Sequence, residues 1–155
     1  MKEYLLQSFA FNDGGNKRML QKIMSLTDKK ECLRHFSHLI NSQNKWLARI
    51  LQEPGVANMS WWDPVYPVDM IETEWEKSQQ QWVGLLTNST EKGLEEEVTF
   101  NGYDGGKWKA KLLDIALQLV YHSIHHRAQM QMMIREQGVE PDFIDYIGTK
   151  YVKLS

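Results

Sequence analysis

The sequence contains one cysteine, four prolines and no long uninterrupted run of apolar residues. The single cysteine, Cys32, excludes an internal disulfide framework. No stretch approaches the roughly 18 apolar residues that a membrane-spanning helix requires. The first residues also lack the apolar run of a secretory signal peptide. We therefore expect a cytoplasmic protein without a membrane partner.

The chain also lacks a large excess of either positive or negative charge. The chain has 18 Lys and Arg against 20 Asp and Glu, a formal net charge of -2. This balance provides no electrostatic basis for binding nucleic acid or an anionic membrane surface. With 155 residues and 42% hydrophobic content, the chain is long enough to bury a core and short enough for one domain spanning residues 1–155.

Helical periodicity prevails, and strand-type alternation is rare. Gly14 and Gly15 predict a kink or break in the first helical segment. Asp69 and Glu72 have the spacing of a capping box at the start of the third helical segment. The pattern predicts an all-α four-helix bundle. Its helices are expected at about Lys2–Met24, from after Thr27 or Asp28 to about Gln52, at Asp69–Thr87 and at Lys109–Gln137.

Two connections have a distinct composition. The glycine-rich turn from Asn101 to Gly106 lies between β-prone pieces that include Val98 and Trp108, which predicts a small hairpin or an irregular insertion before the last helix. The aromatic, proline-containing segment from Ala57 to Val68 favours extended backbone. We expect that loop to pack over an end of the bundle.

Three of the five histidines lie in one run, His122, His125 and His126, within the last helical segment. Residues four apart lie on one side of a helix with Cβ atoms about 5–6 Å apart, so His122 and His126 can direct two imidazoles at one point. At 100° per residue both fall on the flank of the apolar face, whereas His125 falls on the polar side. The spacing indicates two ligands of a transition metal. Hydrogen-bonded core histidines are the alternative.

A third ligand must come from another helix. The second segment offers His35 and His38, and helical phase does not decide between them. Because protons compete with a metal for imidazole nitrogen, binding is expected to weaken as the pH falls through about 6.5.

The pattern His38-Leu-Ile-Asn-Ser-Gln-Asn-Lys-Trp46, followed by His122-xxx-His126-Arg127-Ala128-Gln129, resembles the DinB/YfiT-like superfamily. The Asn16-Lys-Arg region, the glycine-containing hairpin and the tail from Gly138 to Tyr146 extend this resemblance over nearly the whole chain. It implies a bundle with an unusual connection order. It also implies that His38, His122 and His126 bind one divalent transition metal, Zn or Ni, with one position open. His35→Ala and His125→Ala are expected to cost little.

Three further residues are candidates for the surroundings of the metal. Gln129 lies close to the ligand arc and is expected to orient a ligand or water. Arg127 either shares that role or forms a salt bridge with a neighbouring helix. Tyr121 stands where the resembled family commonly has a small polar residue, so it is expected to narrow the pocket or supply a phenolic hydrogen bond.

The resemblance implies a divalent-metal-dependent enzyme, either a hydrolase or a low-molecular-weight-thiol transferase, that acts on a small molecule. The reactive group would be a metal-bound water or thiolate. The chain lacks a His-Glu-x-x-His motif, which argues against a metallopeptidase. An open position beside Tyr121, Trp61 and Trp62 would favour the enzyme. The alternatives are a non-catalytic metal-binding or stress-response protein and a helical interaction module.

A homodimer is also expected. The family resemblance suggests it, and six tryptophans and eight methionines are more than a lone bundle of this size needs.

Overall fold

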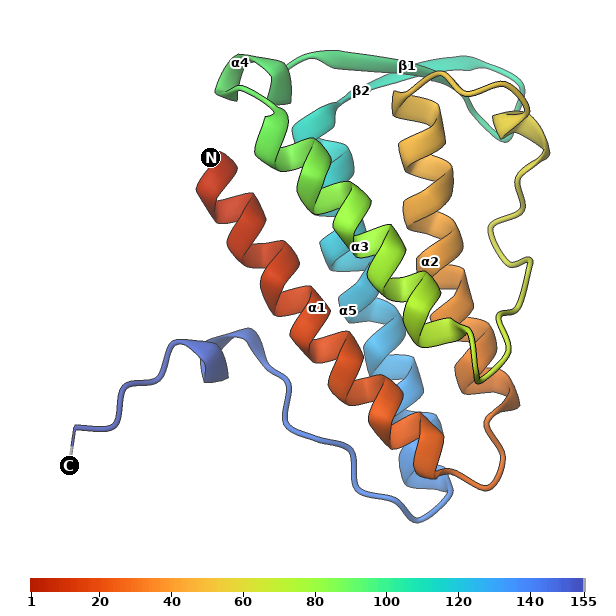
Figure 1. Ribbon diagram of the computed structural model, residues 1–155, viewed down its shortest axis with the longest axis vertical. Coiled ribbons are helices and arrows are strands. Elements are labelled where there is room, and N and C mark those ends of the chain that lie inside the picture. The colour runs from red at the N-terminus through yellow and green to blue at the C-terminus, as the bar shows by residue number, and fades with distance from the viewer. Residues whose placement is uncertain (155) are drawn as a thin grey trace.

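The computed structural model describes residues 1–154. Within that range, long helices form a bundle (Figure 1): α1 (Lys2–Ser25), α2 (Lys30–Ile50), α3 (Ile71–Asn88) and α5 (Leu112–Glu136). Both α1 and α2 pack against α3 and α5, so α1 and α2 lie at diagonal positions. The chain therefore crosses the bundle between α1 and α2 and again between α3 and α5. The predicted all-α bundle is confirmed.

The first helix is continuous, so the break expected at Gly14 and Gly15 is wrong. Gly15 instead permits a close helix contact. A Cβ atom built at Gly15 would lie 3.3 Å from Cζ of Arg127 on α5. A Cβ atom at Gly14 would meet nothing within 4 Å. One glycine thus lets a buried guanidinium reach the α1 backbone, and the other faces solvent.

The first helix starts at Lys2 as predicted, and the starts of the later helices differ from the predicted ones by a few residues at most. Asp28 Oδ1 accepts the backbone N–H of Lys30, the first residue of α2, at 3.0 Å. A side chain just ahead of a helix can thus satisfy one of its first free N–H groups. The capping box predicted at Asp69 is wrong, because α3 begins at Ile71 without a side-chain cap. The backbone N–H groups of Met70 and Ile71 bond instead to the Pro67 carbonyl, each at 3.0 Å. The turn after Pro67 therefore supplies the bonds that a side chain was expected to supply.

The predicted hairpin is confirmed. Strands β1 (Glu97–Asn101) and β2 (Lys107–Lys111) pair antiparallel, with Phe100 opposite Trp108. A short helix, α4 (Glu91–Leu94), precedes them and was not predicted; Thr90 caps it by accepting the Gly93 N–H at 2.9 Å. Because β2 runs directly into α5, that helix starts three residues later than expected.

The core forms two apolar clusters along the bundle, each built around a tryptophan of α3. Trp75 and Trp82 are both fully buried. Their indole N–H groups donate to Asp13 Oδ1 at 2.8 Å and to the Gln43 carbonyl at 3.0 Å. These two tryptophans are therefore core residues. No helix within residues 1–154 is long and apolar enough to cross a membrane.

The aromatic loop between α2 and α3, which includes η1 (Val56–Asn58), runs along the side of α2 rather than over an end of the bundle (Figure 1). Asn41 donates to the Pro64 carbonyl at 3.0 Å, and Ser37 Oγ accepts the Tyr66 N–H at 2.9 Å. These bonds from α2 hold the loop beside the histidines of the same helix.

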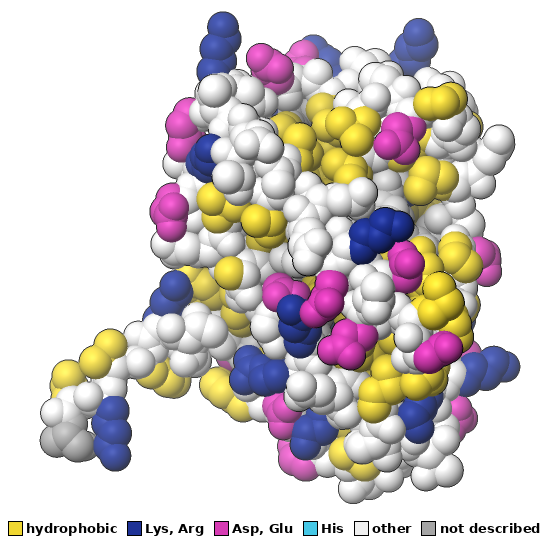
Figure 2. Space-filling view, viewed as in Figure 1, with side chains coloured by type: hydrophobic (Ala, Val, Ile, Leu, Met, Phe, Trp, Pro, Cys, Tyr) yellow, Lys and Arg dark blue, Asp and Glu magenta, His cyan; other side chains and the backbone are white. Residues whose placement is uncertain are grey.

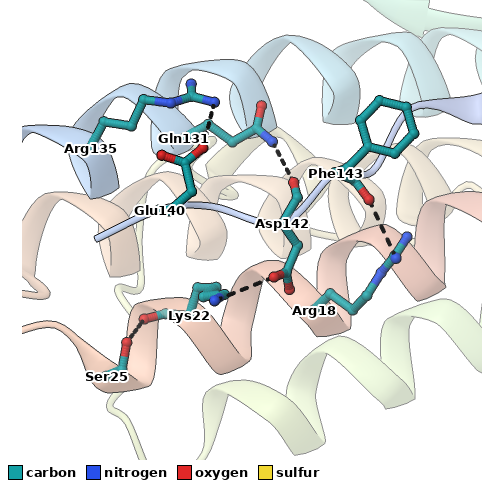
Figure 3. Close-up of polar contacts among 8 residues, drawn as sticks. All are labelled: Arg18, Lys22, Ser25, Gln131, Arg135, Glu140, Asp142 and Phe143. Carbon is teal, nitrogen blue, oxygen red and sulfur yellow. Dashed lines mark hydrogen bonds and ion pairs between the residues drawn. The ribbon is translucent and has the colours of Figure 1, made fainter. Parts of the chain in front are cut away.

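The segment after α5 returns along α1 before it leaves the bundle with η2 (Tyr146–Thr149). Figure 3 shows how its first part is fastened. Asp142 accepts from Lys22 of α1 at 3.3 Å and from Gln131 of α5 at 3.2 Å, and Arg135 lies 3.7 Å from Glu140. Beyond these contacts the tail projects from the body (Figures 1 and 2).

Candidate metal centre

Three histidines from two helices meet at one point in the bundle. His38 lies on α2, and His122 and His126 lie one turn apart on α5. His122 Nε2 is 3.1 Å from His38 Nε2 and 3.0 Å from His126 Nε2. One ligand atom from each ring lies within 4.8 Å of the other two. Nitrogens bound to one zinc ion in a tetrahedral site would be about 3.4 Å apart, given Zn–N bonds of about 2.1 Å. The two separations that involve His122 are close to that value.

A backbone carbonyl determines which nitrogen of His38 faces the other rings. Nδ1 of His38 lies 2.6 Å from the Trp61 carbonyl oxygen, which can only accept a hydrogen bond. The Nδ1–H of His38 therefore donates, and Nε2 carries the lone pair. The Trp62 ring stacks on His38 at 3.9 Å and an interplanar angle of 12°. The aromatic loop thus fixes both the tautomer and the plane of this ring.

A fourth histidine contacts the group from outside. Nδ1 of His126 lies 3.0 Å from Nδ1 of His35, a buried residue one turn before His38 on α2. When His126 donates this proton, its Nε2 also carries a lone pair toward the centre. The unprotonated Nε2 atoms of His38 and His126 then converge with His122 Nε2. When all three rings are neutral, at most one of these three atoms, His122 Nε2, carries a hydrogen that can donate to the others. A cation is the natural partner for such a set.

The electrostatic environment keeps these rings neutral. Burial, together with the neighbouring histidines, lowers the pKa of His126 to about 3 and that of His122 to about 4. Burial also lowers the pKa of His38 and of His35. Neutral imidazole is the form that binds a metal. The group is therefore ready to bind a divalent cation at neutral pH.

The other residues expected at the site lie outside the three-histidine group, and neither Gln129 nor Tyr121 lines the cavity beside it. Gln129, one turn beyond His126, has a buried Oε1 without a hydrogen-bond partner among residues 1–154. Tyr121 is 62% exposed, so the phenol lies at the surface. His125 is exposed, as the helical phase predicted. His125 and His35 both lie outside the three-histidine group.

Arg127 faces α1. It is buried, and its guanidinium donates to Asn12 Oδ1 at 2.5 Å and to Asn16 Oδ1 at 3.0 Å. This position agrees with the alternative interpretation, a contact with a neighbouring helix, although the partners on α1 are neutral amides instead of carboxylates. Arg127 thus joins α5 to α1, and its contacts point away from the ring nitrogens of the site.

A small cavity of about 210 Å³ gives access to His38 and His122. Its other lining residues are Ser42, Trp46, Trp61, Gln118 and Leu119. Ser42 was not predicted from the sequence, and neither was the Trp61 carbonyl. A serine one turn after a histidine is unremarkable in a helix, and a carbonyl carries no sequence signature. Only helical spacing from His38 could have pointed to Ser42.

No curated protein matches the chain in a sequence comparison. The model of the DinB family matches residues 1–153, which is nearly the whole chain. The match agrees with the helical bundle and with the three histidines that the resemblance placed together. The chain belongs to the DinB family.

Proposed function

We propose that this protein is a divalent-metal-dependent enzyme that acts on a small molecule, as a hydrolase or a low-molecular-weight-thiol transferase. One observation carries the proposal: the Nε2 atoms of His38, His122 and His126 converge, with separations of 3.0 and 3.1 Å for the two pairs that involve His122. Three neutral nitrogen donors suit Zn or Ni. Three protein ligands are also the number that catalytic zinc sites use, because a position stays open for substrate.

The bound ion would supply a Lewis acid that lowers the pKa of a water or a thiol at the open position. The chain's own residues would orient that site. Trp61 and His35 fix the proton positions on His38 and His126, and such outer partners hold a ligand ring in place. The small cavity beside His38 and His122 supports an approach of the substrate to the metal site from that side.

The alternative is a metal-binding or stress-response protein without catalysis, in which the same three histidines buffer the ion or stabilise the bundle. The enzyme is favoured because His38 and His122 line a cavity. A structural zinc site is usually closed by four protein ligands. Within the described residues, the group contains three.

The test begins with metal content. Protein purified without an affinity tag is analysed for bound metals, together with five single His→Ala variants. Loss of the ion is expected for His38→Ala, His122→Ala and His126→Ala. The matched surface control, His125→Ala, should keep it. Full occupancy in His126→Ala, or loss in His125→Ala, would contradict the proposed ligand set.

Activity is then assayed with the loaded protein. Transfer of low-molecular-weight thiols to a panel of electrophiles is compared with hydrolysis of ester and amide substrates. Turnover that disappears with His122→Ala supports an enzyme. Stoichiometric metal without any turnover would favour the buffering alternative.

We also propose a homodimer. Apolar side chains of the tail are exposed, including Phe143 at 63%, Tyr151 at 70% and Leu154 at 94%. Figure 2 shows apolar side chains on the projecting tail. Exposed apolar segments of this kind favour association with a second copy.

A further inference from the structure

A second, larger cavity of about 940 Å³ adjoins the small one. It lies between the end of α2, the loop that follows it and the β1–β2 hairpin. Trp46 and Trp61 line both cavities, so the larger space is a neighbour of the histidine site. Small-molecule sites typically enclose about 300–1,000 Å³. The larger cavity is therefore of a size to hold a ligand.

The walls of this cavity are aromatic. Trp46, Trp61, Phe100 and Trp108 all line it. The Arg49 guanidinium lies over three of these rings, at 4.6 Å from Trp46, 4.8 Å from Phe100 and 5.1 Å from Trp61. Flat, polarisable walls favour a ligand with a planar apolar part, because such a part stacks on the rings.

The charges inside the cavity are mainly positive. Lys45 is only 8% exposed, lies 4.6 Å from the Trp61 ring and donates to the Met59 carbonyl. Arg49 donates to the Asn101 carbonyl at 3.0 Å. Among residues 1–154, neither cation has a carboxylate within 4.0 Å. Burying a cation without a counter-charge is costly. An anionic ligand would supply the missing charge.

One buried hydroxyl lines the small cavity beside the histidines. Ser42 is 2% exposed and lines the small cavity with His38 and His122. Its Oγ has no hydrogen-bond partner in the described part of the chain. His38, Ser42, Trp46 and Arg49 follow one another at intervals of four, four and three along α2, so they share one face. That face leads from the histidines to the larger cavity.

We propose that the larger cavity binds the anionic, planar end of an extended organic substrate, whose other end passes Ser42 and reaches the three histidines. The second half of this proposal rests on the proposed function. The first half does not, because the aromatic and basic walls are complete without a metal. The substrate class is thus an organic anion, with a carboxylate, phosphate or sulfonate as its charged group.

Binding at the cavity is tested with two probes of nearly equal shape, 2-naphthoate and neutral 2-naphthamide. Calorimetry of the full chain is expected to show one site that binds 2-naphthoate at least about tenfold more tightly. The indole N–H resonances of Trp46, Trp61 and Trp108 should shift during the titration, and those of buried Trp75 and Trp82 should not. Equal affinity for the two probes, or absence of binding by both, would overturn the anion site.

Two variants test the cations. Arg49→Gln is expected to lower the affinity for 2-naphthoate by about tenfold, because the cation that lies over three of the wall rings is lost. Lys107→Gln changes an exposed residue at the rim and should lower the affinity by about threefold without affecting folding. The matched control is Arg135→Gln, an exposed arginine on α5 outside the cavity. Wild-type affinity in both cavity variants would overturn the assignment.

The connection to the histidines is tested with cobalt. In protein loaded with Co²⁺, the unpaired electrons should accelerate proton relaxation of bound 2-naphthoate, relative to protein loaded with Zn²⁺. His126→Ala should still bind the probe but lose this effect. Probe binding to the cobalt-loaded wild type without faster relaxation would overturn the link between the sites. Failure of the wild type to take up cobalt would contradict the proposed function, while the calorimetry would still decide the anion site.

Discussion

Nδ1 of His126 lies 3.0 Å from Nδ1 of His35, so one hydrogen bond joins two histidines on different helices. His126 is one turn beyond His122, and His35 is one turn before His38. The contact therefore couples α5 to α2 directly behind the three Nε2 atoms. Metal-binding histidines commonly hold their second nitrogen on such a partner, which fixes the ring and its tautomer.

This contact changes the expectation that His35→Ala would cost little. Without the His35 acceptor, His126 is free to rotate or to move its proton to Nε2. We expect His35→Ala to lower metal affinity by about 10- to 100-fold while the stoichiometry of one ion is kept. Competition with a chromophoric zinc chelator measures the change.

His125→Ala is the matched control, since His125 is exposed on the same turn of α5 and lies outside the group. The metal affinity of His125→Ala should equal that of the wild type. His35→Asn, which retains an acceptor, should recover part of the loss. A wild-type affinity for His35→Ala would show that the contact does not orient His126.

The two neighbouring glycines of α1 give opposite predictions. Gly14→Ala should raise the free energy of unfolding by about 1 kcal/mol, because alanine is the better helix former and its Cβ meets nothing within 4 Å. Gly15→Ala gains the same propensity, but it pushes on the Arg127 guanidinium at 3.3 Å. The bonds to Asn12 and Asn16 must then shift.

We expect Gly15→Ala to lower the free energy of unfolding by about 1 kcal/mol relative to the wild type. Urea denaturation of the pair, monitored by helical circular dichroism, measures both changes. Equal stabilisation by the two substitutions would mean that Arg127 adapts at no cost.

Most of the fold could be predicted because the apolar periodicity of the helices is a local property. The hairpin was also local, since glycine-rich turn residues lie between β-prone pieces. The errors came from contacts between distant segments. The close contact that Gly15 permits within α1 is with Arg127, which lies 112 positions further along the chain. The start of α3 depends on a turn at Pro67 that competes with the Asp69 side chain.

The site shows the same limit. Spacing within α5 was sufficient to pair His122 with His126, but helical phase on α2 could not separate His35 from His38. Both residues prove to be buried against α5. His35 contacts Nδ1 of His126, and His38 contacts Nε2 of His122. The resemblance to the family indicated His38. Which of two inward histidines faces which nitrogen depends on how α2 and α5 pack, and no local pattern encodes that.

A homodimer should be visible in sedimentation velocity at micromolar concentrations. If the tail forms the interface, the double change Tyr151→Ser with Leu154→Ser should shift the protein toward monomer. Val65→Ser with Met70→Ser removes two apolar side chains elsewhere that are 45% and 49% exposed, and it should not shift the protein toward monomer. A wild type that sediments only as a monomer would exclude the dimer.

Protonation of the histidine group should also govern how the metal-free protein responds to acid. Burial holds the pKa of His122 at about 4 and that of His126 at about 3, below the value of about 6.5 for an unfolded chain. Between those values the unfolded state binds more protons than the folded state. The stability from the neutral rings is therefore complete above about pH 6.5 and is lost as the pH falls toward the folded-state values.

Chelator-treated protein should accordingly show a falling free energy of unfolding between pH 7 and pH 5, on the order of 1 kcal/mol per pH unit for each ring. The double variant His122→Asn with His126→Asn should have a flatter profile over that range. For the same reason, proton competition with a bound ion should begin at lower pH than the 6.5 expected for ordinary histidines. Urea titrations at several pH values measure the slope. A wild-type slope no steeper than that of the double variant would show that these two rings do not stay neutral in the folded protein.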